Sequence, residues 1–316
     1  MPDLIIIGGG PAGAAAAVYA ARKRLRTIMI VEEWGGQSVV SSDIQNWIGT
    51  INISGTELAV SFRKHVEQYA GEFLEIKRGM RATSLHTFND HVEIELKDGS
   101  RLSAHTALIT TGASRRKLDV PGAAEFDQKG LTYCASCDGP LFADRDVAVI
   151  GGGNAAFETA LQLLAYCRTV TLLNRADSFK ADAITTTSAL AHPHMKAHLN
   201  ADTLEIMGDT FVNGIRWKDM SAQGGKTGAE HTIAVDGVFV EIGLLPNTAW
   251  VGNVVEKNKI GQIIADPRTQ QTSHARVWAA GDCTDALYHQ NNIAAGDAVK
   301  ALEDMYIFLR RSEKEA

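Results

Sequence analysis

The chain has 316 residues, of which 45% are hydrophobic and 22% are charged, and its net charge is −6. This composition is ordinary for a soluble globular protein, and the length suffices for two domains. The acidic balance does not favour a nucleic-acid-binding surface, and no apolar run reaches the roughly 18 residues of a membrane span. The first residues lack the basic start and the cleavage region of a signal peptide, so we expect a cytoplasmic protein.

The strongest chemical signal is a pair of cysteines in the stretch Cys134-Ala135-Ser136-Cys137-Asp138-Gly139. Cysteines at this spacing can close a small redox disulfide, and such pairs commonly have a lowered thiol pKa. Asp138 is placed to move a proton when the disulfide opens. Half of a structural zinc site is the alternative, but it needs further ligands, and Cys167 and Cys283 stand alone in the sequence. We therefore expect a redox disulfide and no metal.

The N-terminal segment predicts a dinucleotide-binding unit. Its expected elements are a strand over 4–7, a helix over 14–23 and a second strand over 27–31 that Glu32 ends. Between the first strand and the helix lie Gly8, Gly10 and Gly13, where the first two let the backbone approach a pyrophosphate and the third permits close packing of helix on strand. Glu32 follows Gly8 by 24 residues, about where an acid bonds the hydroxyls of a ribose.

The middle of the first half shows weaker patterns. Apolar residues at helical spacing predict an amphipathic helix over 56–69, and they are Leu58, Phe62, Val66 and Tyr69. Alternation over 91–96 before Asp98-Gly99 predicts a strand and a hairpin turn, and 107–110 predicts a buried strand. By composition alone, 35–37 and 46–47 are loops. A domain boundary is expected near 119–122.

A second dinucleotide-binding unit begins 143 residues after the first. The expected elements are a strand over 147–150, a helix over 155–165 and a strand over 170–173. Gly151, Gly153 and Ala156 repeat the glycine pattern, with alanine tolerated at the third position. The second strand leads into Asn174 and Arg175 and not into an acid. Two such units in one chain indicate two nucleotides.

The remaining segments are less specific. His192, His194 and His198 lie close in sequence, but no acid or cysteine completes a metal site, so a loop and helix surface is the expectation. Several β-rich runs over 203–242 are broken at 222–226, and Pro246 marks the return to the first domain. A strand is expected over 277–282, and a final helix over 292–309 precedes a frayed end over 310–316.

Taken in order, these motifs resemble those of the low-molecular-weight thioredoxin reductases, which are class II pyridine nucleotide-disulfide oxidoreductases. The motifs that carry the resemblance are Gly8–Gly13, Gly35–Gln37, Cys134–Gly139, Gly151–Ala156 and Ala279–Asp282. Other stretches are similar to the reductase region of the flavoprotein subunit of alkyl hydroperoxide reductase, and they are 139–142, 180–182, 243–248 and 281–284. That subunit carries an additional N-terminal thioredoxin-like region, whereas this chain begins at the first strand, which implies a separate dithiol partner.

The resemblance implies an α/β fold with two Rossmann-like, three-layer ββα dinucleotide-binding domains, the second inserted in the first. It places an FAD domain at 1–118 and 246–316, and an NAD(P) domain with the redox cysteines at 119–245. The residues it places at FAD are Gly8, Gly10, Pro11, Ala12, Gly13, Glu32, Gly36, Gln37, Asn46, Gly112, Gly281, Asp282, Gln290 and Asn291. The residues it places at the pyridine nucleotide are Gly151, Gly153, Asn154, Ala155, Ala156, Asn174, Arg175, Lys180 and Gly243.

The same resemblance assigns roles to the cysteines and names partners. Cys137 would face the flavin, Cys134 would attack the disulfide of a partner, and Asp138 would be the acid–base group. The implied partner is thioredoxin or a thioredoxin-like or glutaredoxin-like protein, and the implied assembly is a homodimer. The family also rotates its smaller domain to alternate access to the flavin.

The electron donor is where this sequence departs from the family pattern. The family's NADPH site carries His-Arg-Arg and a further arginine, whereas this chain has Asn174, Arg175, Ala176 and Lys180. Since no acid is present to reject a 2′-phosphate and Arg175 can bind one, we expect a modest preference for NADPH over NADH. The alternatives are a ferredoxin-type donor, a small-molecule dithiol oxidase and a flavin-binding sensor; the second glycine motif argues against the oxidase, and the cysteine pair argues against the sensor.

Overall fold

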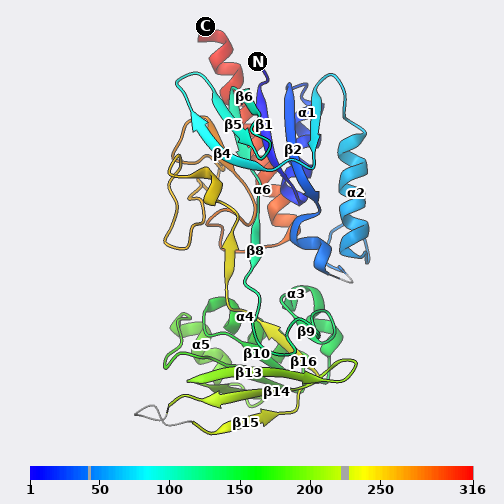
Figure 1. Ribbon diagram of the computed structural model, residues 1–316, viewed down its shortest axis with the longest axis vertical. Coiled ribbons are helices and arrows are strands. Elements are labelled where there is room, and N and C mark those ends of the chain that lie inside the picture. Colours follow the sequence, from blue (N-terminus) through cyan, green and yellow to red (C-terminus); the bar gives the residue numbers. More distant parts are fainter. Residues whose placement is uncertain (42–43, 222–227, 316) are drawn as a thin grey trace. The chain divides into compact units, whose positions relative to one another are not determined.

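The computed structural model describes residues 1–41, 44–221 and 228–315, and the chain in it forms two compact units (Figure 1). Of these residues, the first unit holds 1–41, 47–114 and 245–315, and the second holds 44–46, 115–221 and 228–244. The chain changes unit within two short strands that pair with each other, β8 (Ala113–Arg115) and β17 (Leu244–Pro246). The assignment of one cofactor to each unit stays a prediction.

A five-stranded parallel sheet lies at the centre of the first unit. Its strands, in spatial order, are β18 (Val277–Ala279), β7 (Thr106–Ile109), β1 (Leu4–Gly9), β2 (Thr27–Trp34) and β3 (Leu74–Arg78). The helices of this unit are α1 (Pro11–Arg22), α2 (Gly55–Glu67) and α6 (Asn291–Glu315), with short 3₁₀ turns η1 (Gly36–Val40) and η3 (Ala249–Val251). An antiparallel sheet of β4 (Ala82–Thr87), β5 (Val92–Leu96) and β6 (Arg101–Ala104) completes it.

Side chains along the central strands point alternately to the two faces of the parallel sheet. Both faces are covered, so the unit has three layers. Ile5 and Ile7 of β1 pack in one core cluster with the antiparallel sheet, including Leu85 and Ile94. The other face of the parallel sheet is covered by α1, which packs against α6. The alanines of α1 other than Ala15 are buried, and their small side chains let the helix approach its neighbours closely. The three layers are the antiparallel sheet, the parallel sheet and the helices.

The second unit repeats this architecture. Its parallel sheet runs β12 (Met195–His198), β11 (Thr169–Leu173), β10 (Asp146–Ile150), β16 (Gly237–Val240) and β9 (Leu131–Thr132). An antiparallel sheet consists of β13 (Ala201–Gly208), β14 (Val212–Asp219) and β15 (Glu230–Ile233). The helices are α3 (Ala135–Asp138), α4 (Asn154–Leu164) and α5 (Ala183–Leu190), and η2 (Gly139–Phe142) is a 3₁₀ turn. The expected α/β class with two such sheets is confirmed.

Most predicted elements are present, and four of their ends differ from the prediction by three or more residues. Helix α1 begins at Pro11 and not at Ala14, because proline fits the first helical position and Gly10 is the N-cap residue. Strand β2 continues past Glu32 to Trp34, where Gly35 takes a φ of 89°. Strand β18 ends at Ala279, since Gly281 takes a φ of 78°. Helix α6 runs to Glu315, beyond the predicted end at 309.

Other predictions are met or fall outside the described residues. The hairpin at Asp98-Gly99 joins β5 and β6, and Gly99 has a φ of 83°. In α2, Leu58, Phe62 and Val66 are buried as predicted, whereas Tyr69 lies beyond the helix and is half-buried. The predicted break at 222–226 lies outside the described residues. No described helix combines the length and the apolar character needed to cross a membrane.

Candidate functional site

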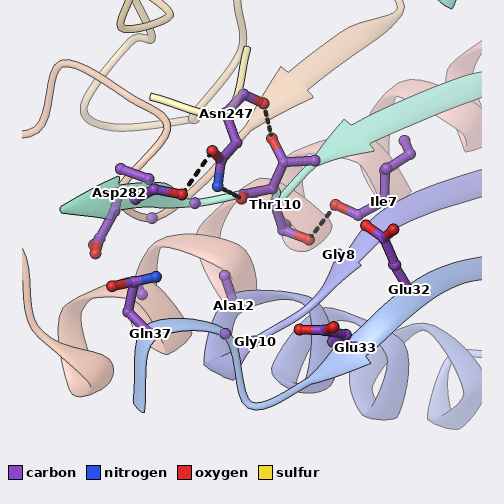
Figure 2. A pocket seen from close by; sticks show the side chains of 18 of the residues that line it. Ile7, Gly8, Gly10, Ala12, Glu32, Glu33, Gln37, Thr110, Asn247 and Asp282 are labelled. Atoms are coloured by element: carbon purple, nitrogen blue, oxygen red, sulfur yellow. Dashed lines mark hydrogen bonds between the residues drawn. The ribbon is translucent and has the colours of Figure 1, made fainter. Parts of the chain in front are cut away.

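A cavity of about 720 Å³ opens at the carboxyl ends of β1, β2, β7 and β18 in the first unit (Figure 2). This edge is where open α/β sheets bind ligands, and the volume lies in the range of small-molecule sites. The predicted FAD residues that line it are Gly8, Gly10, Pro11, Ala12, Glu32, Gly36, Gln37, Gly112, Gly281, Asp282 and Asn291. Separate loops after four strands thus converge on one space.

The glycine turn after β1 is fixed by close backbone contacts. Gly8 has a φ of 128°, and a Cβ there would lie 2.2 Å from the carbonyl oxygen of Thr110. Gly13 does not line the cavity; a Cβ on it would lie 1.9 Å from the carbonyl oxygen of Gly8. Its role is therefore the close packing of α1 on β1. A Cβ on Gly112 would meet nothing within 4 Å, so that backbone is open to a ligand.

The residues present fit FAD in this cavity. A backbone of glycines can approach a pyrophosphate, the N-terminus of α1 supplies amides and a positive dipole, and Glu32 stands where a ribose acid is needed. Asp282 lines the same space, and its Oδ1 lies 3.3 Å from Nδ1 of His289.

Besides Gly13, two predicted FAD residues do not line this cavity. Asn46 and Gln290 are absent from the residues that line it, as far as the described parts of the chain go. Asn46 is grouped with the second unit, and Gln290 precedes α6, where its carbonyl accepts from the amide of Ala294 at 2.9 Å.

Sequence reasoning missed Asn247, which lines the cavity and forms hydrogen bonds with the segment after β7. Its Nδ2 donates to the carbonyl of Thr111 at 3.0 Å, and its Oδ1 accepts from the hydroxyl of Ser114 at 3.0 Å (Figure 2). The amide of Asn247 donates to the carbonyl of Gly112 at 3.0 Å. Thr110 on the same loop donates from its hydroxyl to the carbonyl of Ile7 at 2.8 Å. From the sequence, Asn247 was identified only as part of the 243–248 stretch, and no role was predicted for it.

The predicted redox pair is closed as a disulfide in the second unit. Cys134 is the N-cap residue of α3, and the Cα atoms of Cys134 and Cys137 are 5.3 Å apart. The amide of Cys137 donates to Sγ of Cys134 at 3.2 Å. Asp138 is buried and accepts a hydrogen bond from the hydroxyl of Thr132. A disulfide and a buried, oriented carboxylate thus lie within five residues of each other.

The two other cysteines lack the environment of a reactive thiol. Cys167 and Cys283 are buried, and burial raises the pKa of their thiols to about 11 and about 12. A thiol with a raised pKa carries little thiolate near neutral pH, so it is a poor nucleophile. Of the four cysteines, the pair at 134 and 137 is therefore the candidate for thiol chemistry.

The second glycine turn follows β10 and, like the first, is fixed by close backbone contacts. Gly151 has a φ of 145°, and a Cβ on it would lie 2.3 Å from the carbonyl oxygen of Glu241. Ala156 is fully buried beside it, which is the packing role of the third position. Gly153 is the N-cap of α4 and has nothing within 4 Å of a built Cβ. The N-terminus of α4, with Asn154 and Ala155, is thus open to an anion.

A loop after β11 is fastened to this turn. The amide of Lys180 donates to the carbonyl of Gly152 at 2.7 Å, and the amide of Asp182 donates to Oδ1 of Asn154 at 2.8 Å. Asn174 is buried, and its Nδ2 donates to the carbonyls of Ala176 at 3.2 Å and Ser178 at 2.8 Å. The Asn174 side chain therefore holds its own loop.

Arg175 and Lys180 are exposed on that loop. Gly243, the last residue predicted for this site, has a φ of 107°, and its carbonyl accepts from the amide of Arg116 at 3.0 Å.

Glu241 is a second residue that the sequence did not reveal. Its amide donates to the carbonyl of Ile150 at 2.8 Å, at the carboxyl ends of β10 and β16. Its side chain accepts from the Thr159 hydroxyl at 3.1 Å and lies 3.8 Å from Arg115. Burial raises the pKa of Glu241 to about 7, against the opposing effects of Arg115 and Thr159.

The clustered histidines have ordinary partners. Nδ1 of His194 lies 2.7 Å from the carbonyl oxygen of Arg168, and the ring of His198 packs on Trp217. Across the described ranges, no group of three or more His, Cys, Asp or Glu residues is placed to hold a metal ion.

A model of the pyridine nucleotide-disulphide oxidoreductase family matches residues 2–299. The chain belongs to this family. Membership agrees with the two glycine turns and the Cys134–Cys137 disulfide, and it implies FAD and NAD(P)H as cofactors. It also confirms the resemblance drawn from the motifs.

Relatives within the family carry several names. An NADH dehydrogenase of Bacillus subtilis (strain 168) is 41% identical over 310 residues, which is 98% of this chain and 59% of that protein. An alkyl hydroperoxide reductase component of Staphylococcus aureus (strain MRSA252) is 38% identical over the same shares of each chain. This chain thus spans about 59% of the length of these curated relatives.

Solved structures of thioredoxin reductases match over nearly the whole chain. The enzyme from Streptococcus pyogenes MGAS5005 is 33% identical with a TM-score of 0.86, and 98% of this chain and 99% of that one are covered. The enzyme from Giardia duodenalis is 30% identical with a TM-score of 0.90, at the same coverage. The fold of this chain is therefore similar to that of thioredoxin reductases.

Proposed function

We propose that this protein passes electrons from NAD(P)H, through FAD, to the Cys134–Cys137 disulfide and then to a disulfide in a thioredoxin-like or glutaredoxin-like protein. The observation that carries the proposal is the closed Cys134–Cys137 disulfide beside the buried Asp138. Bound FAD would supply the two-electron chemistry that connects a hydride donor to a disulfide.

Cys134, Cys137 and Asp138 then each have a separate role in the thiol chemistry. Once the pair is reduced, the thiolate of Cys134 attacks a sulfur of the partner disulfide, and the partner's other sulfur leaves. Cys137 then attacks Cys134 in the mixed disulfide, which restores the bond seen here and releases the partner as a dithiol. Two electrons leave the chain in this exchange, and the partner takes up two protons. Asp138 is the acid–base group for these protons.

Support for the roles of the two cysteines comes from the geometry of α3. The amide of Cys137 already points at Sγ of Cys134, and the N-terminus of a helix stabilises negative charge on a capping residue. The carbonyl of Ala135 accepts from Nε2 of Gln162 at 3.1 Å, which ties α3 to α4. The pair is therefore held on a supported turn.

We further propose NADPH as the preferred donor, by a modest margin. Arg175 and Lys180 are exposed on a loop that hydrogen bonds fasten to the second glycine turn, so both cations are available to a 2′-phosphate. The name of the Bacillus subtilis relative favours NADH instead. The absence of an acid at Asn174 or Arg175 is the reason for choosing NADPH.

The partner and the assembly complete the proposal. A thioredoxin-like or glutaredoxin-like protein presents an exposed disulfide of the right kind, and the two solved relatives bear the name thioredoxin reductase. The assembly we propose is a homodimer in the cytoplasm.

The test is reduction of a panel of thioredoxin-like proteins by the purified, FAD-loaded chain with each nucleotide under anaerobic conditions. Wild type is expected to hold about one FAD per chain and to reduce at least one partner. Cys134→Ser and Cys137→Ser are each expected to lose partner reduction and keep flavin reduction by the nucleotide. The proposal fails if either variant reduces a protein disulfide near the wild-type rate, or if the protein takes up no FAD.

A further inference from the structure

The cavity of the first unit has an unusual balance of charge for the ligand proposed to fill it. Glu32, Glu33 and Asp282 line it, and all three are carboxylates. Among the described residues that line the cavity, Arg81 is the one lysine or arginine. FAD carries a pyrophosphate with two negative charges, and three carboxylates without a cation would repel it. The cation that faces this cavity is therefore a candidate for a role in binding.

Arg81 is held in place by its backbone. It lies in the segment between β3 and β4, where the amide of Met80 donates to the carbonyl of Val31 at 3.3 Å. The carbonyl of Arg81 accepts from the amide of Lys97 at 2.9 Å. These two bonds tie the segment to β2 on one side and to the antiparallel sheet on the other. The position of Arg81 beside the end of β2 is thus set by the fold.

The side chain of Arg81 contacts the predicted ribose acid directly. Its Nε lies 2.5 Å from Oε2 of Glu32, and 64% of the Arg81 side chain and 39% of that of Glu32 are exposed. Only one of the donors of the guanidinium is used in this contact, and only one oxygen of the carboxylate. Among the residues that the structure describes, the second oxygen of Glu32 and the terminal amino groups of Arg81 make no further hydrogen bond, so they can serve as acceptor and donors to a ligand.

This geometry indicates which half of a bound dinucleotide Arg81 and Glu32 would contact. An acid at the end of the second strand accepts from ribose hydroxyls, so the Arg81–Glu32 pair marks the adenosine half of a bound dinucleotide. A charge-assisted contact fixes the carboxylate in one orientation before the ligand arrives. A planar guanidinium can also stack on an adenine ring, which a lysine ammonium cannot do in the same way.

Resting on the proposed function, we propose that Arg81 is a cofactor-positioning residue that makes the cavity selective for FAD over flavins that lack the adenosine half. It holds Glu32 toward the ribose hydroxyls and supplies the positive charge that offsets the acidic lining. The isoalloxazine half of the ligand gains nothing from this pair.

The test is the affinity of the full-length protein, stripped of flavin, for FAD and for FMN, measured by quenching of flavin fluorescence. Arg81→Ala is expected to weaken FAD binding by about ten- to a hundredfold, as loss of a charge-assisted contact implies, and to weaken FMN binding less, because FMN carries a phosphate but no adenosine half. Arg81→Lys is expected to fall between wild type and Arg81→Ala, because it keeps the charge without the planar group. The salt dependence of FAD binding is expected to weaken in Arg81→Ala.

Arg101→Ala is the matched control, since Arg101 is an exposed arginine of the same unit that pairs with Glu93 and Glu95 and does not line the cavity. It is expected to bind FAD as wild type does. Unchanged FAD affinity in Arg81→Ala, or equal losses for FAD and FMN, overturns the proposal and leaves the proposed function intact. Wild-type protein that binds no FAD at all overturns both.

Discussion

The hydroxyl of Thr132 donates a hydrogen bond to the carboxylate of Asp138, and both side chains are buried in the second unit. Thr132 ends β9 and Asp138 ends α3, so this bond links the strand before the redox pair to the helix that carries it. The same hydroxyl accepts from the amide of Cys134 at 3.3 Å. Thr132 therefore orients both the acid–base group and the cysteine proposed to attack the partner.

From the Thr132–Asp138 bond we predict that variants at these two positions slow disulfide exchange to different extents. Asp138→Asn is expected to slow partner reduction by roughly 10²-fold or more, as loss of a general acid–base group does. Thr132→Val is expected to slow it less, because the carboxylate remains but is no longer oriented. Flavin reduction by the nucleotide, followed by stopped flow, is expected to be unchanged in both. Thr171→Val, another buried threonine of this unit, is the control and should retain partner reduction.

Gly13 tests the packing of the first glycine turn. Because a Cβ on Gly13 would lie 1.9 Å from the carbonyl oxygen of Gly8, Gly13→Ala must displace α1 from β1. We expect a loss of roughly 1–3 kcal/mol in the free energy of unfolding, together with weaker FAD retention. Gly296→Ala in α6, where a Cβ meets nothing within 4 Å, is expected to stabilise the protein by about 0.5–1 kcal/mol. Denaturant unfolding of both variants checks this, and a fully stable Gly13→Ala would contradict it.

Arg175 tests the nucleotide preference. Arg175→Ala is expected to reduce the ratio of kcat/KM for NADPH to that for NADH by about ten- to a hundredfold, the value of one charge-assisted hydrogen bond. Arg145→Ala is the control, since Arg145 directly precedes β10 at the amino edge of the same sheet. A wild-type preference for NADH, or a ratio that does not change in Arg175→Ala, would refute the assignment of the 2′-phosphate to this residue.

Glu241 predicts a pH dependence of stability. Burial raises the pKa of its carboxyl to about 7 from its ordinary value of 4.5, so between these values the folded chain keeps a proton that the unfolded chain has lost. The contribution of Glu241 to stability therefore falls as pH rises through this window, and it is lowest above about pH 7. Glu241→Gln cannot ionise, so its stability relative to wild type is expected to increase between about pH 5 and about pH 8. Urea unfolding at both values measures this, and a relative stability that decreases with pH would contradict the prediction.

The sequence was most informative where function depends on local spacing. The two glycine turns, the helices after them and the Cys134–Cys137 pair all act through contacts between residues close in the chain, and the structure contains each of these elements. Strand and helix ends were less predictable. Gly35 and Gly281 set where β2 and β18 stop, and their positive φ values are a property of the folded backbone.

Sequence reasoning missed several residues whose roles depend on tertiary contacts. Asn247 bonds Thr111 across 136 positions, and Arg81 pairs with Glu32 across 49. The sequence shows Glu241 only as an acid at the end of a strand, and its burial beside Thr159 and Arg115 is visible only in the folded chain. Asn174, which was predicted at the pyridine nucleotide, donates from its side-chain amide to the loop that follows it, a contact that the sequence did not reveal.

The most direct test of the electron relay is an anaerobic titration of the FAD-loaded protein with NADPH, followed by flavin absorbance and by counting free thiols. We predict that wild type takes up about two equivalents of NADPH per chain, one for the flavin and one for the Cys134–Cys137 disulfide, and gains two thiols. Cys134→Ser and Cys137→Ser are each predicted to take up about one equivalent. A wild-type flavin that is fully reduced by one equivalent, with no gain in thiols, would contradict the relay.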